Sequence, residues 1–219
     1  MKKQKSEHAL AIIKAGISAV PVVGGPIASL IGDYVPTATQ QSIEGMIAYL
    51  VEYLERLRDR IDTVVISKDE FTDHFKSAYL CVVRTTRGEK IRAASAVIAN
   101  ALLKPGDPDK FSYSELDHLA RAVDELSVGV IHVLGVVYDR ALPAADQRQP
   151  EKSYRIDFHQ IRVDLSYEPS LLLGLLEELR AKNLVHQWAL PSVREPEYGN
   201  YPFELTPLGV RFVERLLRW

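Results

Sequence analysis

The segment FELTPLGVRFVERL, residues 203–216, decides the fold of the carboxyl-terminal part of the chain. A strand is predicted over residues 201–205, where apolar and aromatic residues cluster. The turn Thr206-Pro207-Leu208-Gly209 then starts a predicted helix that continues through Trp219. Val210, Val213 and Leu217 are its apolar positions. We therefore expect a strand that runs directly into a closing helix.

The elements that precede this segment follow from periodicity and turn composition. A helix is predicted to begin at Ser127, because apolar residues recur from there near the 3.6-residue period, and Pro143 is predicted to end it. Pro169 suits the first position of a later helix, and Asn183 is a plausible carboxyl-terminal cap. In order, the predicted elements are a helix over 127–142, a polar loop over 144–153, a strand over 154–157, a helix over 158–165, a turn over 166–169, a helix over 170–182, a strand over 184–190, a loop over 191–200 and a strand over 201–205.

This order is that of a winged helix-turn-helix, with residues 184–205 as the β-hairpin wing. The sequence therefore predicts a mainly α chain, with a helical bundle over 1–126 and a winged helix-turn-helix over 127–219. The segment quoted above resembles the end of many bacterial winged-helix domains, in which a strand enters a closing helix through a Thr-Pro-x-Gly turn.

Composition narrows the class of protein. The chain has 219 residues, 47% of them apolar and 26% charged, which is typical of a folded globular protein. The net charge of −2 provides no general attraction to nucleic acid or anionic lipid. One cysteine, Cys81, excludes an internal disulfide framework and indicates a reducing compartment. We expect a cytoplasmic protein whose basic amino-terminal residues are not a signal peptide.

Residues 15–32 carry no charge, but Pro21 and Pro26 interrupt them. A helical hairpin is expected, either buried in the bundle or acting on a membrane or in assembly. Ile17, Val22, Ile27 and Leu30 would carry the second role. An apolar hairpin followed by amphipathic helices resembles, in style, the helical cell-death domains of fungal and bacterial immunity proteins.

The next segment, 39–62, has apolar residues three and four apart. This pattern predicts an amphipathic bundle helix or, alternatively, a coiled-coil helix that joins two copies of the chain. Capping-box patterns at Ser67 and Ser112 open two further helices. The segments EKIRAASAVIANALL (89–103) and YSELDHLARAVDELS (113–127) resemble uncharacterised bacterial proteins of defence-type gene neighbourhoods.

Catalytic and metal-binding motifs are not found in the sequence. No two of the six histidines have the i, i+4 spacing of a helical zinc pair, and there is no Cys-x-x-Cys. His74 and Cys81 could share a helix face, but two ligands do not complete a site. There is no nucleophile elbow or phosphate-binding glycine loop. We expect no enzyme activity, no metal and no cofactor.

Two sets of residues are candidates for binding. The first is a basic cluster, which is either a solvated helix junction or a phosphate or nucleic-acid contact; it comprises Arg84, Arg87, Lys90 and Arg92. The second is the helix at the recognition position, 170–182. If it binds duplex DNA, the contacts would come from Tyr167, Ser170 and Arg194. Its carboxylates disfavour phosphate, and Leu171 and Leu173 suit a protein partner better.

The leading hypothesis is a non-enzymatic interaction or regulatory protein of bacterial origin, part of an anti-phage defence or cell-death system, that binds a protein partner through its winged helix. One alternative is a winged-helix transcription regulator that binds DNA. Another is a membrane-perturbing effector that acts through residues 15–32. A homo-oligomer through residues 39–62 is a further expectation.

Overall fold

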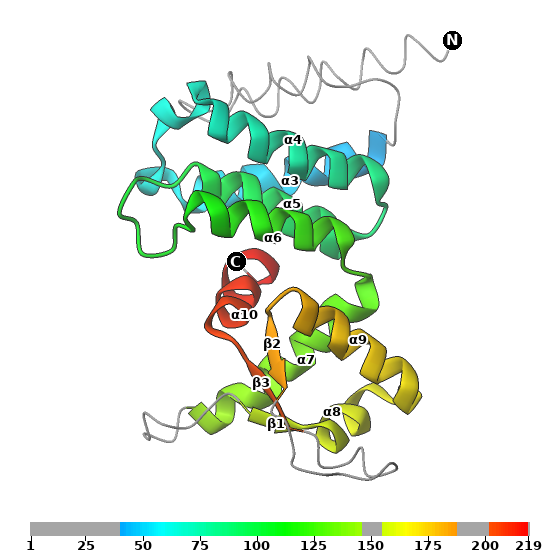
Figure 1. Ribbon diagram of the computed structural model, residues 1–219. Coiled ribbons are helices and arrows are strands. Elements are labelled where there is room, and N and C mark those ends of the chain that lie inside the picture. Colours follow the sequence, from blue (N-terminus) through cyan, green and yellow to red (C-terminus); the bar gives the residue numbers. More distant parts are fainter. Residues whose placement is uncertain (1–39, 146–154, 188–201, 219) are drawn as a thin grey trace, which may run out of the picture. The chain divides into compact units, whose positions relative to one another are not determined.

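The computed structural model describes residues 40–145, 155–187 and 202–218 (Figure 1). The described chain is mainly helical with a small three-stranded antiparallel sheet, so the prediction of a mainly α protein is confirmed. Two compact units can be distinguished. The first extends to Glu125 and includes Arg215–Leu217, and the second comprises Leu126–Glu214 with Arg218.

From residue 40 on, where the structure describes the chain, four long helices build the first unit. They are α3 (Gln40–Arg56), α4 (Asp69–Arg84), α5 (Gly88–Ala101) and α6 (Tyr113–Glu125), with 3₁₀ turns η1 (Arg58–Arg60) and η2 (Thr63–Ser67) between the first two. Helix α5 is central, because it packs against α3, α4 and α6. Its five alanines and other small residues allow these neighbours to approach closely, and residues 93–101 are all buried.

The apolar stripe of α3 packs against another helix of the same chain. Ile43, Met46, Leu50 and Leu54 are buried, and α3 packs on α5. This burial favours the bundle-helix interpretation of the 39–62 pattern. A second copy of the chain would have to contact other residues of this helix.

Both predicted capping-box segments precede a helix, but only one of the two predicted caps is correct. At α6, the Glu115 amide donates to Ser112 Oγ at 3.3 Å and the Ser112 amide donates to Glu115 Oε2 at 2.8 Å, which confirms the capping box. At α4, Lys68 rather than Ser67 is the cap residue, and its side chain makes no capping bond. The reason is that Ser67 is the last residue of η2, which Asp62 caps through the amide of Val64.

The connection between α5 and α6 is held by charge and by one amide. The Arg60 guanidinium donates to Asp107 Oδ2 at 2.8 Å and to Asp109 Oδ2 at 2.6 Å, and it keeps the pKa of Asp107 below its usual value. The buried Asn100 side chain donates to the Asp109 carbonyl at 2.9 Å and accepts from the Phe111 amide at 3.0 Å. These bonds give residues 104–111 a defined course without regular secondary structure.

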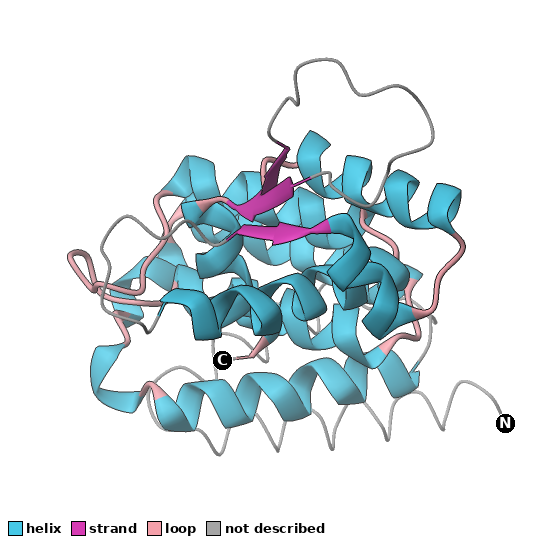
Figure 2. Cartoon of the chain, turned by 90° about the horizontal axis from the view of Figure 1, so that it is seen from below, coloured by secondary structure: helices cyan, strands magenta, loops and turns pink. Residues whose placement is uncertain are grey.

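The second unit combines helices with the sheet (Figure 2). Its elements are α7 (Val128–Ala145), β1 (Arg155–Asp157), α8 (Phe158–Leu165), α9 (Pro169–Ala181), β2 (Val185–Gln187), β3 (Pro202–Leu205) and α10 (Pro207–Phe212). A π-helical segment (Val213–Leu217) follows α10, and its first two residues belong to this unit. The strand order is β1-β3-β2, and both pairings are antiparallel. Ile156 lies opposite Phe203, and Val185 lies opposite Leu205.

Helix α7 differs from the prediction at its end, because it continues past Pro143 to Ala145. A proline so close to the carboxyl end removes one backbone hydrogen bond and does not divide a long helix. The helix packs against α8 and α9. The core of this unit is formed by its buried apolar side chains, which include Val130, Leu134, Ile156, Phe158, Ile161, Leu172, Leu176, Leu179, Phe203 and Phe212.

The turn before α10 rests directly on the end of α9. Thr206 caps α10, since its hydroxyl accepts from the Gly209 amide at 2.9 Å and donates to the Asn183 carbonyl at 2.7 Å. Asn183 itself has a φ of 56°, as residues that end helices often do. A Cβ atom added to Gly209 would lie 2.0 Å from the Leu184 carbonyl oxygen. The glycine of the Thr-Pro-x-Gly turn is therefore required by this close backbone approach.

We predict opposite effects for two glycine substitutions in this unit. Gly209→Ala should lower the free energy of unfolding by about 3 kcal/mol, because a backbone segment must move to admit the methyl group. Gly174→Ala on α9 should raise it by about 0.5 kcal/mol, since a Cβ there has no atom within 4 Å and alanine favours a helix. Urea denaturation of the full chain measures both. Equal effects would contradict the close approach.

Candidate functional site

Helix α9 presents one buried and one open face. Leu172, Leu175, Leu176 and Leu179 are buried, as the predicted stripe requires. On the open side, the Leu171 side chain is 52% exposed and Leu173 is half-buried. Gly174, Glu177 and Glu178 are also exposed. This face combines one large apolar side chain, a position without a side chain, and two carboxylates.

The amino terminus of α9 is already occupied by a carboxylate. Glu168 Oε2 accepts from the Leu171 amide at 3.1 Å and from the Ser170 hydroxyl. The Ser170 hydroxyl, followed by the backbone amides, holds the pKa of Glu168 below its usual value. Helix amino termini attract anions because their amides are unpaired. Here an internal negative charge satisfies them, so a phosphate at this place would meet repulsion.

Tyr167 lies in the turn between α8 and α9, half-buried, next to Ser166, which has a φ of 53°. Tyr167 in this turn and Ser170 and Leu171 in the first turn of α9 therefore all lie at the amino-terminal end of that helix. Arg194, the remaining residue predicted for DNA contact, lies outside the described residues. The structure thus places part of the predicted DNA-contact set on this helix end.

The arginines of the second unit are largely paired. Arg140 Nε donates to Asp164 at 2.6 Å, Arg180 Nε donates to Glu177 at 2.7 Å, and Arg218 donates to Asp139 at 2.5 Å. Residues 158–181 contain two arginines and four carboxylates. Because phosphate neutralisation supplies most of the affinity for DNA, the excess of carboxylates over arginines disfavours binding of a duplex to α8 and α9.

The basic cluster of the first unit is divided by its contacts. Arg84 donates to the Asp124 carboxylate at 2.9 Å, and Lys90 donates to the Asp124 carbonyl at 2.6 Å, so both stabilise the carboxyl end of α6. The Arg92 guanidinium lies 5.4 Å from the centre of the Tyr49 ring. Arg87 is exposed and makes no ion pair within the described residues. This arrangement favours a solvated helix junction over a phosphate site.

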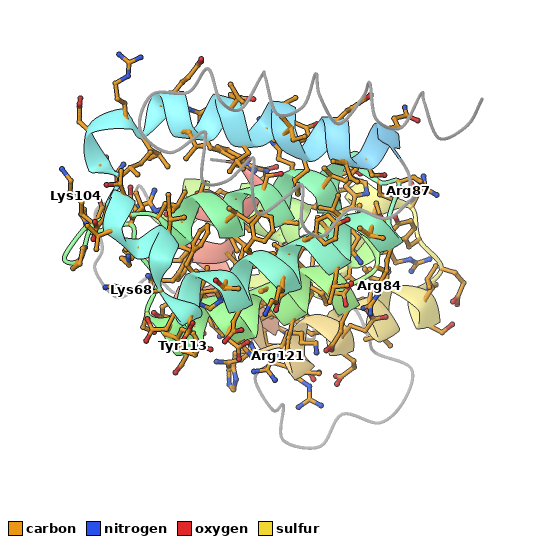
Figure 3. The ribbon with its side chains drawn as sticks, turned by 90° about the horizontal axis from the view of Figure 1, so that it is seen from above. Lys68, Arg84, Arg87, Lys104, Tyr113 and Arg121 are labelled. Carbon is orange, nitrogen blue, oxygen red and sulfur yellow. The ribbon has the colours of Figure 1, made fainter. Side chains whose placement is uncertain are left out.

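Figure 3 shows that Arg84 and Arg87 lie at one end of the first unit, while Lys68 and Tyr113 lie at the other. The basic side chains labelled there do not form one compact patch. Arg121, also labelled, forms an ion pair with Asp117.

The residues predicted for a membrane or assembly role lie outside the described part of the chain; they are Ile17, Val22, Ile27 and Leu30. Among the helices that are described, none has the length and apolar character needed to cross a bilayer.

Several apolar side chains that are exposed among the described residues were not identified from the sequence, and Val163 and Val64 are the most exposed of them. Val163 on α8 is 64% exposed, and Val64 in η2 is 65% exposed. Val163 follows the buried Ile161 by two positions, and such positions point to opposite sides of a helix. That spacing was the signal that could have identified Val163. For Val64 the sequence carries no comparable signal, because a short 3₁₀ turn has no extended periodicity.

His74 and Cys81 are both buried in α4. Burial raises the pKa of the Cys81 thiol to about 11. Burial also holds the pKa of His74 below its usual 6.5, although Asp117, Asp73 and Glu70 oppose this effect and Lys110 adds to it. Over residues 40–145, 155–187 and 202–218, no three His, Cys, Asp or Glu side chains are placed to hold a metal ion.

Comparison of the chain with protein-family models, with curated proteins and with solved structures finds no match.

We predict a stability loss on acidification that depends on His74. The unfolded chain binds a proton at this imidazole near pH 6.5, and the folded chain does so only at lower pH. Stability is therefore lost as the pH falls from that value. Between about pH 7.5 and about pH 5, the free energy of unfolding should decrease more for the natural chain than for His74→Phe. As a control, replacing the exposed His132 with Gln should leave the decrease as large as in the natural chain. Chemical denaturation at several pH values measures this, and identical profiles for the natural chain and His74→Phe would contradict the prediction.

Proposed function

We propose that the second unit is a winged helix-turn-helix that binds a protein partner through α9. The order α7, β1, α8, α9, β2, β3 supports this assignment. So does the three-residue turn from Ser166 to Glu168, because helix-turn-helix units join their two helices by turns of this length. The resemblance of residues 203–216 to the end of bacterial winged-helix domains is a further support.

The single observation that carries the choice of partner is the carboxylate at the start of α9. Helix-turn-helix proteins place the amino-terminal residues of this helix against base edges. In this chain Glu168 occupies the end of the helix, and the Ser170 hydroxyl is engaged by it. The same end exposes Leu171. An apolar contact beside negative charge suits a protein surface better than a DNA groove.

The charges define the partner's chemistry. Glu178 is exposed and makes no ion pair within the described residues. Glu168 adds a second negative charge near Leu171. We infer a partner segment that places one large apolar side chain on Leu171, with lysine or arginine on either side of it. Aromatic and arginine side chains commonly dominate such contacts.

The unit acts in this proposal by binding and regulating, without catalysis. An anti-phage defence or cell-death context and a bacterial source stay predictions that rest on the resemblances given above. A cytoplasmic location stays a prediction that rests on the single cysteine.

Peptide selection against the full-length protein tests the proposal. We expect selected peptides to share a large apolar residue flanked by basic residues. Leu171→Asp should weaken their binding by about tenfold or more, because it removes the apolar contact and adds repulsion next to Glu168. The matched control is Val64→Asp, which changes an equally exposed valine of the first unit and should leave binding unchanged.

Charge reversal and a DNA assay separate the alternatives. Glu178→Lys should weaken the binding of the selected basic peptides. It should strengthen the binding of peptides in which glutamate replaces lysine. No mobility shift is expected with duplex DNA at low salt. A sequence-specific shift that weakens steeply with salt, and that Leu171→Asp leaves intact, would overturn the proposal in favour of a DNA-binding regulator.

A further inference from the structure

A cavity of about 180 Å³ lies in the first unit, at the end opposite Arg84 and Arg87. Its walls come from η2, from the first two turns of α4, from the connection between α5 and α6, and from the start of α6. Phe71, Phe111 and Leu116 provide its apolar surface, and His74, Tyr113 and Lys68 are among its polar lining residues. The Arg60 and Asn100 hydrogen bonds described above hold the connecting segment in place.

His74 is the unusual feature of this cavity. The residue is only 5% exposed, and its ring lies against the Tyr113 ring at an interplanar angle of 46°, with 4.7 Å between the centroids. Within the described residues the imidazole makes no hydrogen bond. The ring therefore contributes an unused donor and an unused acceptor to the lining of the cavity.

The rim of the cavity carries charge that the described residues do not neutralise. Lys68 is exposed and makes no ion pair among them, and the same holds for Glu70. Lys110 also lines the cavity, where its ammonium donates to the carbonyls of Ala101 and Leu103. Two lysines and one glutamate line the cavity, and the carboxylates of Asp73 and Asp117 act on His74 from outside this lining. The Lys68 ammonium at the rim can pair with one carboxylate of a ligand, and the surrounding carboxylates disfavour a second negative charge.

We propose that this cavity binds a small monocarboxylate with a single apolar ring. Its size fits, since an apolar cavity of roughly 150 Å³ accommodates benzene. The ring contacts Phe71, Phe111 and Leu116. The carboxylate accepts hydrogen bonds from the His74 imidazole and the Lys68 ammonium. This site is independent of the α9 surface, because all its residues belong to the first unit.

Benzoate is the probe for this proposal, and NMR of the ¹⁵N-labelled full-length chain is the measurement. The His74 ring signals, identified through their contact with Tyr113, should move saturably as benzoate is added. Lys68→Gln should raise the Kd for benzoate by about two- to fivefold, which is the effect expected for the loss of a partly exposed ion pair. Lys76→Gln is the matched control, because it makes the same change on α4, the helix that Lys68 precedes, at a position outside the cavity, and it should leave the Kd unchanged.

Benzyl alcohol has the ring of benzoate without its carboxylate, so it distinguishes the contributions of these two groups to binding. It should bind more weakly than benzoate to the natural chain and equally to the natural chain and Lys68→Gln. Benzoate that leaves the His74 signals unmoved at millimolar concentration would overturn the proposal. Equal Kd values for benzoate in the natural chain and in Lys68→Gln would overturn it too, because the anion would then not contact the lysine.

Discussion

The approach of Gly209 to the Leu184 carbonyl is the constraint on which the second unit depends. A side chain at residue 209 would place its Cβ 2.0 Å from that oxygen, so α10 can begin here only with glycine at its third position. Because Thr206 also bonds to Asn183, the end of α9 and the start of α10 are joined through backbone and cap. Strand β3 precedes this junction directly and lies between β1 and β2, so the register of the whole sheet is tied to it.

The first unit depends on a different device, the small side chains of α5. Alanines and a serine let three helices pack closely on one, and the Ser95 hydroxyl donates to the Ile91 and Met46 carbonyls within this contact. Close packing of this kind leaves little space at the centre. The cavity lies instead at one end, where an irregular segment replaces a helix and polar groups face it. A ligand site is therefore compatible with a well-packed bundle.

In both units, charged side chains mainly form ion pairs and helix caps within the same unit. Glu168 caps α9, Asp124 holds Arg84, and Asp164 holds Arg140. Exposed pairs of this kind contribute little to stability, but they cancel the positive potential that DNA binding needs. Two places in the described residues combine apolar and charged groups: Leu171 beside carboxylates on α9, and the cavity around His74 with Lys68 at its rim. In the proposals made above, each of them binds a partner or ligand that has an apolar part and an opposite charge.

By itself, the sequence determined the order of the described α-helices and strands, the buried stripes of α3 and α9, and the cap at Ser112, because periodicity and capping act between neighbours along the chain. Only the tertiary structure decided that β1 pairs with β3, why residue 209 must be glycine, and which carboxylate pairs with which arginine. Arg60 meets Asp107 across 47 positions of sequence. The cavity around His74 likewise needs residues from four separate elements. Such contacts depend on the geometry of packing, which local patterns do not encode.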